Sequence, residues 1–121
     1  MDADFIRDLF CEFGPVDVRR MFSGTGVFAG GLMVALVVRD VLYLKSDEAG
    51  AARFAAEGCE QFGYTRPDRG RTALPYWRVP DRLLDDPAEL AAWARDALAV
   101  ARARKAAQVK RKPRSGKKKR G

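Results

Sequence analysis

The stretch from Arg19 to Phe28 holds the residues whose types and spacing could support chemistry. It reads Arg-Arg-Met-Phe-Ser-Gly-Thr-Gly-Val-Phe, so two basic side chains precede two glycines that flank a threonine. Gly24 to Ala29 fits the dinucleotide-binding pattern G-x-G-x-x-A, and Asp47 lies near the offset of a ribose-binding acid. That motif needs a helix N-terminus directed at the pyrophosphate. Because β-type apolar runs follow instead, we interpret the glycines as serving a sharp turn and close packing.

The usual sets of catalytic residues are not present in the sequence. There is no histidine, which general acid–base catalysis at neutral pH most often uses. The acidic residues are scattered over expected helix surfaces, turns and caps, and Ser23 has no candidate base near it in sequence. Cys11 and Cys59 do not have the spacing of metal ligands. The sequence therefore predicts a protein that is not an enzyme and that holds no metal or cofactor.

Basic and aromatic side chains on neighbouring expected strands form a candidate binding face. Such groups together suit phosphate contacts and base stacking. The candidate face consists of Arg19, Arg20, Phe22, Lys45, Tyr76, Trp77 and Arg78. The alternative interpretation is that the charged positions face solvent while the aromatic side chains fill the core, which is their usual place.

The C-terminal segment carries the strongest functional signal in the sequence. The chain has a net charge of +7, yet residues 1–101 contain twelve basic and sixteen acidic residues, a net charge of −4. Residues 102–121, here called the basic extension, hold the other eleven cations and no acid. These cations are Arg102, Arg104, Lys105, Lys110, Arg111, Lys112, Arg114, Lys117, Lys118, Lys119 and Arg120. The basic character of the chain is therefore a property of its end and not of its folded surface.

We expect the basic extension to bind DNA through phosphate contacts. Each phosphate that it neutralises on duplex DNA adds about 0.9 to the salt dependence of binding. The extension has no aromatic residue to stack on bases, so the binding should be non-specific. Lysine- and arginine-rich arms bind anionic surfaces in general. A solubilising arm, a membrane-surface arm or an extension without function therefore stay open as alternatives.

The apolar pattern predicts an α+β fold with an antiparallel sheet and helices packed on it. The expected order is one helix, four strands, a second helix, two strands and a third helix, with the packed domain at residues 1–101. A helix is expected at residues 2–13, and strands at 16–22, 27–29, 32–39 and 41–45. Gly30-Gly31 and Arg39-Asp40 are expected turns, so these strands form a meander. The apolar run from residue 32 favours a central strand that is buried on both faces.

The second half of the chain has clear helix boundaries and two weaker strand signals. Ser46 is expected to cap a helix that ends at Gly58. Strands are expected at residues 62–65 and 74–79, with a loop at 67–71 between them. Asp86-Pro87-Ala88-Glu89 is a typical helix start.

The last helix is expected to extend beyond the end of its buried face. Its apolar spacing ends near Ala101, but alanine, lysine and arginine favour helix as far as about Val109. From Pro113 the sequence has nothing to bury, which predicts disorder. We therefore expect a domain at residues 1–101, followed by a helical and then disordered basic tail at 102–121.

Four segments of the chain resemble, in order, the N-terminal domain of the TfoX/Sxy family. They are Met21 to Phe28, Leu42 to Asp47, Gly58 to Tyr64 and Pro75 to Asp81, and an Asp-Asp-Pro helix start and a helix with Trp93 follow. The resemblance covers most of residues 5–100. It implies a small α+β domain that occurs in bacterial regulators of natural competence, where regulation is linked to the cyclic-AMP receptor protein. Full-length members add a second, helical domain, which we do not expect in this chain.

The resulting expectation is a regulatory protein that acts by binding. It would be competence- or transcription-related, with DNA and a regulatory protein as its partners, and a homodimer stays open. A protein–protein adaptor is the alternative, and a small-ligand sensor with a pocket near Gly24 to Gly26 is a third. The acidic N-terminus and the short apolar run from Val27 to Val38 favour a cytoplasmic protein without a membrane span.

Overall fold

The computed structural model describes residues 1–21, 24–68 and 70–120, and the side chains of all these except Tyr64, Arg66 and residues 110–120. The helices are α1 (Ala3–Leu9), α2 (Glu48–Ala56), the short 3-10 helix η1 (Asp81–Asp85) and α3 (Pro87–Arg120). The strands are β1 (Asp17–Met21), β2 (Gly24–Ala29), β3 (Leu32–Val38), β4 (Val41–Lys45), β5 (Gln61–Arg66) and β6 (Gly70–Arg78). The predicted α+β class with an antiparallel sheet is confirmed.

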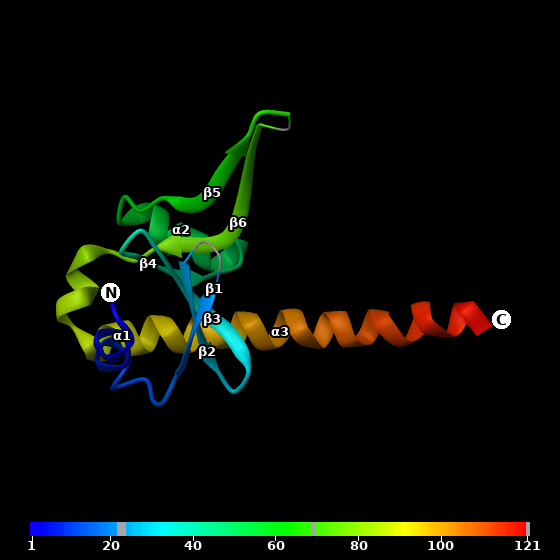
Figure 1. Cartoon of the computed structure of the whole chain (residues 1–121), viewed down its shortest axis with the longest axis horizontal. Coiled ribbons are helices and arrows are strands. Elements are labelled where there is room, and N and C mark those ends of the chain that lie inside the picture. Colours follow the sequence, from blue (N-terminus) through cyan, green and yellow to red (C-terminus); the bar gives the residue numbers. More distant parts are fainter. Residues whose placement is uncertain (22–23, 69, 121) are drawn as a thin grey trace.

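The six strands form one antiparallel sheet in the order β1-β2-β3-β4-β6-β5. The strands β1 to β4 follow one another as a meander, and β6 joins β4 after the chain has passed through α2 and β5. The hairpin of β5 and β6 projects away from the rest of the sheet (Figure 1). The strand β3, which was predicted to be central, has four buried residues in a row from Val34 to Val37.

One core lies between the sheet and the helices. The helix α3 crosses the sheet and contacts β3 and β4, while α1 contacts β1 and α2 contacts β6. Ile6 and Phe10 from the α1 end of the chain, Phe54 from α2 and Leu90 from α3 are at most 2% exposed. Phe54 joins the layers, because its ring lies 6.0 Å from that of Trp77 and 5.0 Å from that of Trp93.

Two tight turns set the register of the meander. Gly30 and Gly31 have φ angles of 58° and 82°, as a two-residue hairpin turn requires. Arg39 and Asp40, between β3 and β4, have φ angles of 50° and 65°. Both turns lie where the sequence predicted them, but the second places two side-chain-bearing residues in the region that glycine and asparagine prefer.

The glycines Gly24 and Gly26 lie inside β2 and do not form a turn. The sequence predicted a strand only from Val27, with a tight turn or bulge at Thr25. In the structure β2 starts at Gly24, where a Cβ atom would stand 2.2 Å from the carbonyl oxygen of Val37 on β3. Close approach of neighbouring strands therefore explains this glycine.

Three further boundaries differ from the sequence prediction. The cap of α2 is Asp47, whose Oδ1 accepts a hydrogen bond from the Gly50 amide at 2.8 Å, and not Ser46. The helix α1 ends at Leu9, before residue 13, because the chain turns at Phe10. The strand β6 starts at Gly70, so Gly70 and Arg71 of the expected loop are paired with β5.

The helix α3 continues to Arg120, whereas the sequence predicted its end near Val109 and disorder from Pro113. Its packed first half supplies the nucleus, after which alanine, lysine and arginine favour helix as far as Lys112, whereas Pro113 and Gly116 oppose it. Among the described side chains of α3, the last buried one is Ala101, and those of residues 102–109 are exposed. The basic extension therefore leaves the body of the protein (residues 1–101) as a helix, to the right in Figure 1. None of the helices in the described part of the chain has the length and apolar character needed to cross a membrane.

Candidate functional site

The sheet presents two faces of different character, which the strand register defines. Residues paired across neighbouring strands have side chains on the same face of the sheet. One row faces the helices and reads Val18, Val27, Ala35, Leu44 and Trp77. The adjacent row lies on the opposite face, here called the open face, and reads Arg19, Gly26, Leu36, Tyr43 and Arg78. The open face thus has an arginine at each end of this row and uncharged residues between.

A groove lies on the open face between the β3–β4 turn and the β5–β6 hairpin. Its volume is 760 Å³, compared with 470 Å³ or less for three other hollows of the described surface. Its floor is built from half-buried apolar side chains, namely Val38, Val41, Tyr43, Phe62 and Leu74. The rings of Tyr43 and Phe62 meet edge to face, with centroids 4.8 Å apart and an interplanar angle of 61°. The size and lining suit the capture of apolar side chains.

Three arginines surround this floor, and we call the whole site the arginine groove. Arg71 is held in place, because its Nη2 donates to the Gln61 carbonyl oxygen at 3.0 Å and its guanidinium lies over Gly63. Arg78 is loosely paired with Asp81, whose Oδ1 lies 3.5 Å from Nη2. Arg39 has no ion-pair partner among the described residues. Glu60 is the one acid among the described lining residues, so the rim has an excess of positive charge.

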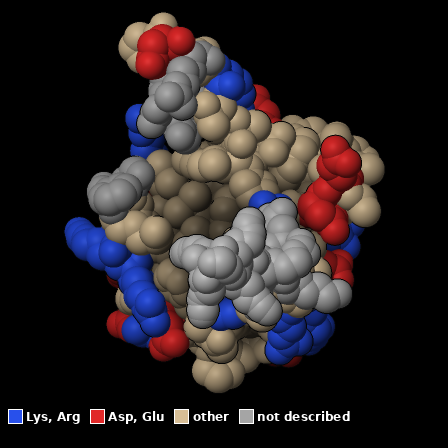
Figure 2. All heavy atoms as spheres, turned by 90° about the vertical axis from the view of Figure 1, so that its right-hand side faces the viewer, with Lys and Arg blue, Asp and Glu red and all other residues tan. Residues whose placement is uncertain are grey.

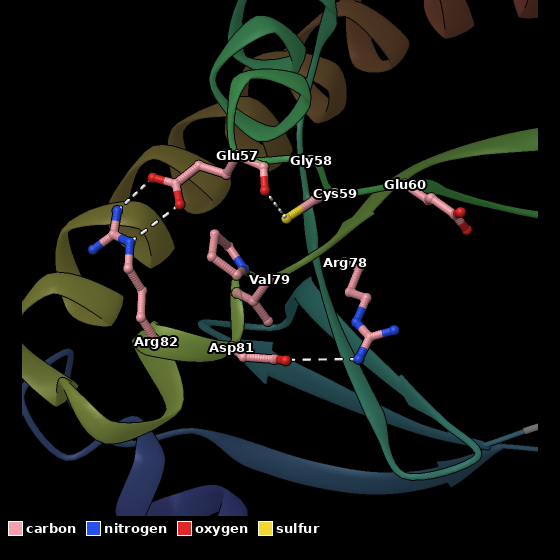
Figure 3. Close-up of a pocket in the computed structure, with 9 residues that line it drawn as sticks. Glu57, Gly58, Cys59, Glu60, Arg78, Val79, Asp81 and Arg82 are labelled. Carbon is pink, nitrogen blue, oxygen red and sulfur yellow. Dashed lines mark hydrogen bonds and ion pairs between the residues drawn. The ribbon is translucent and has the colours of Figure 1, made fainter.

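A second hollow lies on the other side of Arg78 and is lined mainly by charged and polar groups (Figure 3). Its cysteine, Cys59, points toward the Glu57 carbonyl oxygen, with the sulfur 4.0 Å away. Burial raises the pKa of the Cys59 thiol, and the charge of Glu57 adds to the effect. A raised pKa lowers the fraction of nucleophilic thiolate at neutral pH. This environment does not activate the cysteine.

Lys45 and Tyr76 form a contact on the same open face, at the other end of β4. The Lys45 Nζ lies 5.4 Å from the centroid of the Tyr76 ring. Burial raises the pKa of Tyr76 to about 12, so its hydroxyl stays protonated at neutral pH. Burial also lowers the pKa of Lys45, and repulsion from Arg104 on α3 lowers it further. Arg104 therefore brings the start of the basic extension within electrostatic range of the open face.

A comparison with protein families identifies the body of the chain. The family model described as the TfoX N-terminal domain matches residues 8–101. The chain belongs to the TfoX N-terminal domain family. The resemblance of the four sequence segments is thereby confirmed, and the chain is a TfoX-like regulatory domain. A search among curated proteins found no match.

The match to the TfoX N-terminal domain ends at Ala101, which is also the last buried residue of α3. In the basic extension the side chains of Arg102, Arg104 and Lys105 are exposed, and the other eight cations lie outside the described side chains. Figure 2 views the molecule from the side toward which α3 runs. This side is hollowed, the visible floor of the hollow is tan, and lysine and arginine side chains lie along part of its rim.

The residues of the candidate face that the sequence analysis predicted lie on both faces of the sheet in this TfoX-like domain. Four of its residues share the open face, namely Arg19, Lys45, Tyr76 and Arg78. Arg20 is paired with Thr25 and lies on the helix side, at the exposed edge strand β1. Trp77 packs against Phe54 in the core, as the alternative interpretation held for the aromatic residues. Phe22 lies outside the described residues.

Even the four residues on the open face are spread across the sheet. Arg19 on β1 lies with its guanidinium carbon 4.6 Å from the Phe28 ring centroid, whereas Arg78 is four strands away on β6. Tyr76 is only 6% exposed, so little of it is available to a partner. The six described members therefore do not gather into one basic and aromatic spot.

The sequence analysis missed most of the arginine groove. Arg39 and Arg71 were assigned to a turn and a loop, and Phe62 was assigned to a strand with no prediction of the face on which it lies. The signal that was present is alternation in β4, where Leu42 and Leu44 are buried while Val41, Tyr43 and Lys45 are half-buried. Alternation alone could not reveal that β6 pairs with β4 and brings Arg78 beside Tyr43.

Proposed function

We propose that this TfoX-like domain acts as a non-enzymatic regulator, in competence or transcription, and that its basic extension holds it on DNA without sequence preference. The observation that carries the proposal is the division of charge. The body has a net charge of −4, and the extension adds eleven cations on a helix that leaves the body. At 1.5 Å per residue the helical part of the extension is about 28 Å long, which is the length of roughly eight base pairs.

The extension has the properties of a phosphate-binding arm. Arg102, Arg104 and Lys105 are exposed, so they can reach phosphates without rearrangement of the core. The sequence after Trp93 holds no aromatic residue, which removes base stacking as a source of affinity. Phosphate contacts alone position a protein on DNA but do not read its sequence. Target choice would then come from a partner protein or from the body.

Binding to a fluorescent 24-base-pair duplex, measured against salt concentration, tests the proposal. We expect the full chain to bind with a slope of log K against log salt of roughly −5 to −10, because five to eleven cations each contribute about 0.9. A chain that ends at Ala101 should lose this binding, since the body is acidic. A shuffled duplex should bind the full chain equally well.

Two results would contradict the DNA-binding proposal. If the chain ending at Ala101 binds with the same slope, then the body and not the extension contacts DNA. If the full chain shows no salt-dependent binding between 50 and 200 mM salt, roughly the range in which a loss of 10³-fold or more is expected, the nucleic-acid role is wrong.

A second candidate function is a protein–protein adaptor, and the arginine groove favours it. An apolar floor with charged groups at its rim is the arrangement by which many proteins hold a partner segment. The third candidate, a small-ligand sensor near Gly24 to Gly26, has less support. A Cβ atom at Gly26 would stand 2.8 Å from the Met21 sulfur, so side chains already fill the space over that glycine.

A further inference from the structure

We propose that the arginine groove binds an extended segment of a partner protein that combines apolar side chains with two or three aspartates or glutamates. This inference deepens the adaptor candidate and does not rest on DNA binding by the basic extension. It is carried by the groove's volume, its apolar floor and the charge of its rim. The partner's apolar side chains would lie on Tyr43, Phe62 and Leu74, and its carboxylates would pair with the arginines.

Charge complementarity argues for carboxylates in the partner. The described lining holds Arg39, Arg71 and Arg78 but one acid, Glu60, and beyond the lining Asp81 pairs loosely with Arg78. An arginine can bind a carboxylate with two parallel hydrogen bonds, and charge-assisted bonds of this kind are about twice as strong as neutral ones. Arg71 is already oriented by Gln61 and Gly63, so little conformational freedom would be lost when it binds.

The backbone at Arg39 provides an independent argument. Its φ angle of 50° is in a region that is unfavourable for most residues with a side chain, and asparagine or glycine would reduce this cost. Such strain clusters where a side chain is needed for function. The carboxylate of the neighbouring Asp40 pairs with the Met1 amino group and not with the Arg39 guanidinium. The rim of the groove therefore has an arginine at a position whose backbone conformation is unfavourable for it.

Single-stranded nucleic acid fits the groove less well than a peptide. Base stacking needs exposed ring faces, but Tyr43 and Phe62 are half-buried, and in their edge-to-face contact the edge of one ring covers a face of the other. The body as a whole is acidic, which repels a polyanion more than a segment with two or three charges. The floor is otherwise aliphatic, with Val38, Val41 and Leu74.

A second copy of the chain also fits less well. A symmetric dimer would place the same patch opposite itself, so that three arginines of one copy would face three of the other. Like charges brought together across an interface disfavour its formation. One glutamate per copy, Glu60, would not compensate.

Selection from a random 12-residue peptide library displayed on phage tests the inference with the full chain as bait. The library is first depleted on the double variant R39N/R71Q, which keeps the basic extension and so removes peptides that bind there. We expect the enriched peptides to combine apolar residues with at least two acids. A synthetic peptide of the most enriched sequence should then bind the full chain, and each single variant, Arg39→Asn and Arg71→Gln, should weaken binding roughly tenfold or more.

Two controls separate the groove from folding and from overall charge. Arg95→Gln removes one cation from the exposed side of α3 and should leave peptide binding unchanged. Arg39→Asn should raise the melting temperature, because asparagine tolerates the positive φ angle better. A loss of binding in a variant that is at least as stable as the natural chain cannot be attributed to unfolding.

Several outcomes would overturn the inference. Enriched peptides without acidic residues, or equal peptide binding by Arg39→Asn, Arg71→Gln and the natural chain, would show that the arginines do not contribute to peptide binding. Binding of a 12-nucleotide oligo(dT) that both variants weaken, and that competes with the peptide, would make the groove a nucleic-acid site. Dimerisation in sedimentation experiments that both variants abolish would assign it to a second copy. Loss of DNA binding in the truncated chain bears on the extension and not on this inference.

Discussion

At the scale of single residues, two neighbouring glycines of β2 serve different contacts. A Cβ atom at Gly24 would stand 2.2 Å from the backbone oxygen of Val37, which can move only if β3 moves. At Gly26 the nearest atoms, both 2.8 Å away, are the Met21 sulfur and the Phe28 ring, which belong to side chains. The same substitution should therefore have different consequences two residues apart.

We expect Gly24→Ala to destabilise the protein by about 1–3 kcal/mol, because strands β2 and β3 must separate to admit a methyl group. Gly26→Ala should cost less, since methionine is flexible and can move aside. Urea denaturation of both variants measures the difference. Equal costs at the two positions would show that close strand packing at Gly24 is not the reason for that glycine.

At the scale of elements, Arg82 links three segments that are separate in the sequence. It lies in η1, donates from Nε to Glu57 at the end of α2 at 3.1 Å, and donates from Nη1 to Glu89 at the start of α3 at 2.8 Å. The hydrogen bond from Arg82 lowers the pKa of both carboxyls below the ordinary value of 4.5. All three side chains are near solvent, so the effect on stability is modest and sensitive to salt.

The variant Arg82→Gln should change how stability depends on acid. A carboxyl whose pKa is lowered by folding contributes stability above its unfolded value of 4.5, and this contribution is lost as the pH falls through the folded value. We therefore expect Arg82→Gln to lower the urea midpoint at pH 7. Near pH 3 the urea midpoint of the variant should be close to that of the natural chain. Arg95→Gln serves as the control. A difference at pH 3 as large as that at pH 7 would exclude the ion pairs as the cause.

At the scale of the whole molecule, charge and packing divide the chain at the same place. The body carries the core and a net charge of −4, and the basic extension carries eleven cations beyond the last buried residue, Ala101. The opposite signs mean that the extension can engage an anionic partner while the body repels it. The open face of the sheet is then available for a different kind of partner.

We expect removal of the basic extension to change helix content but not the stability of the body. A chain that ends at Ala101 should have a free energy of unfolding within about 0.5 kcal/mol of the full chain, since the residues just beyond Ala101 are exposed. The total circular dichroism at 222 nm should fall in magnitude, because α3 reaches Arg120. An unchanged total signal would mean that the extension is not helical in solution, against both the structure and the predicted helix as far as about Val109.

The sequence by itself determined the class of the fold and the division of charge. Local backbone preference, which can be read directly from the sequence, sets three of these features. They are the Gly30-Gly31 turn, the apolar run of β3 and the Asp86-Pro87 helix start. The motifs around Met21, Leu42, Gly58 and Pro75 also led to the family that the comparison shows. The eleven cations of the extension needed no structure to be counted.

Only the tertiary structure decided which side chains meet. The register that pairs Tyr43 with Arg78 and Leu44 with Trp77 places one arginine on the open face and the neighbouring tryptophan in the core. Pairing between β4 and β6 joins residues more than thirty positions apart. Local propensity carries no information on such contacts. For this physical reason the arginine groove and the separation of Arg19 from Arg78 could be found only in the folded chain.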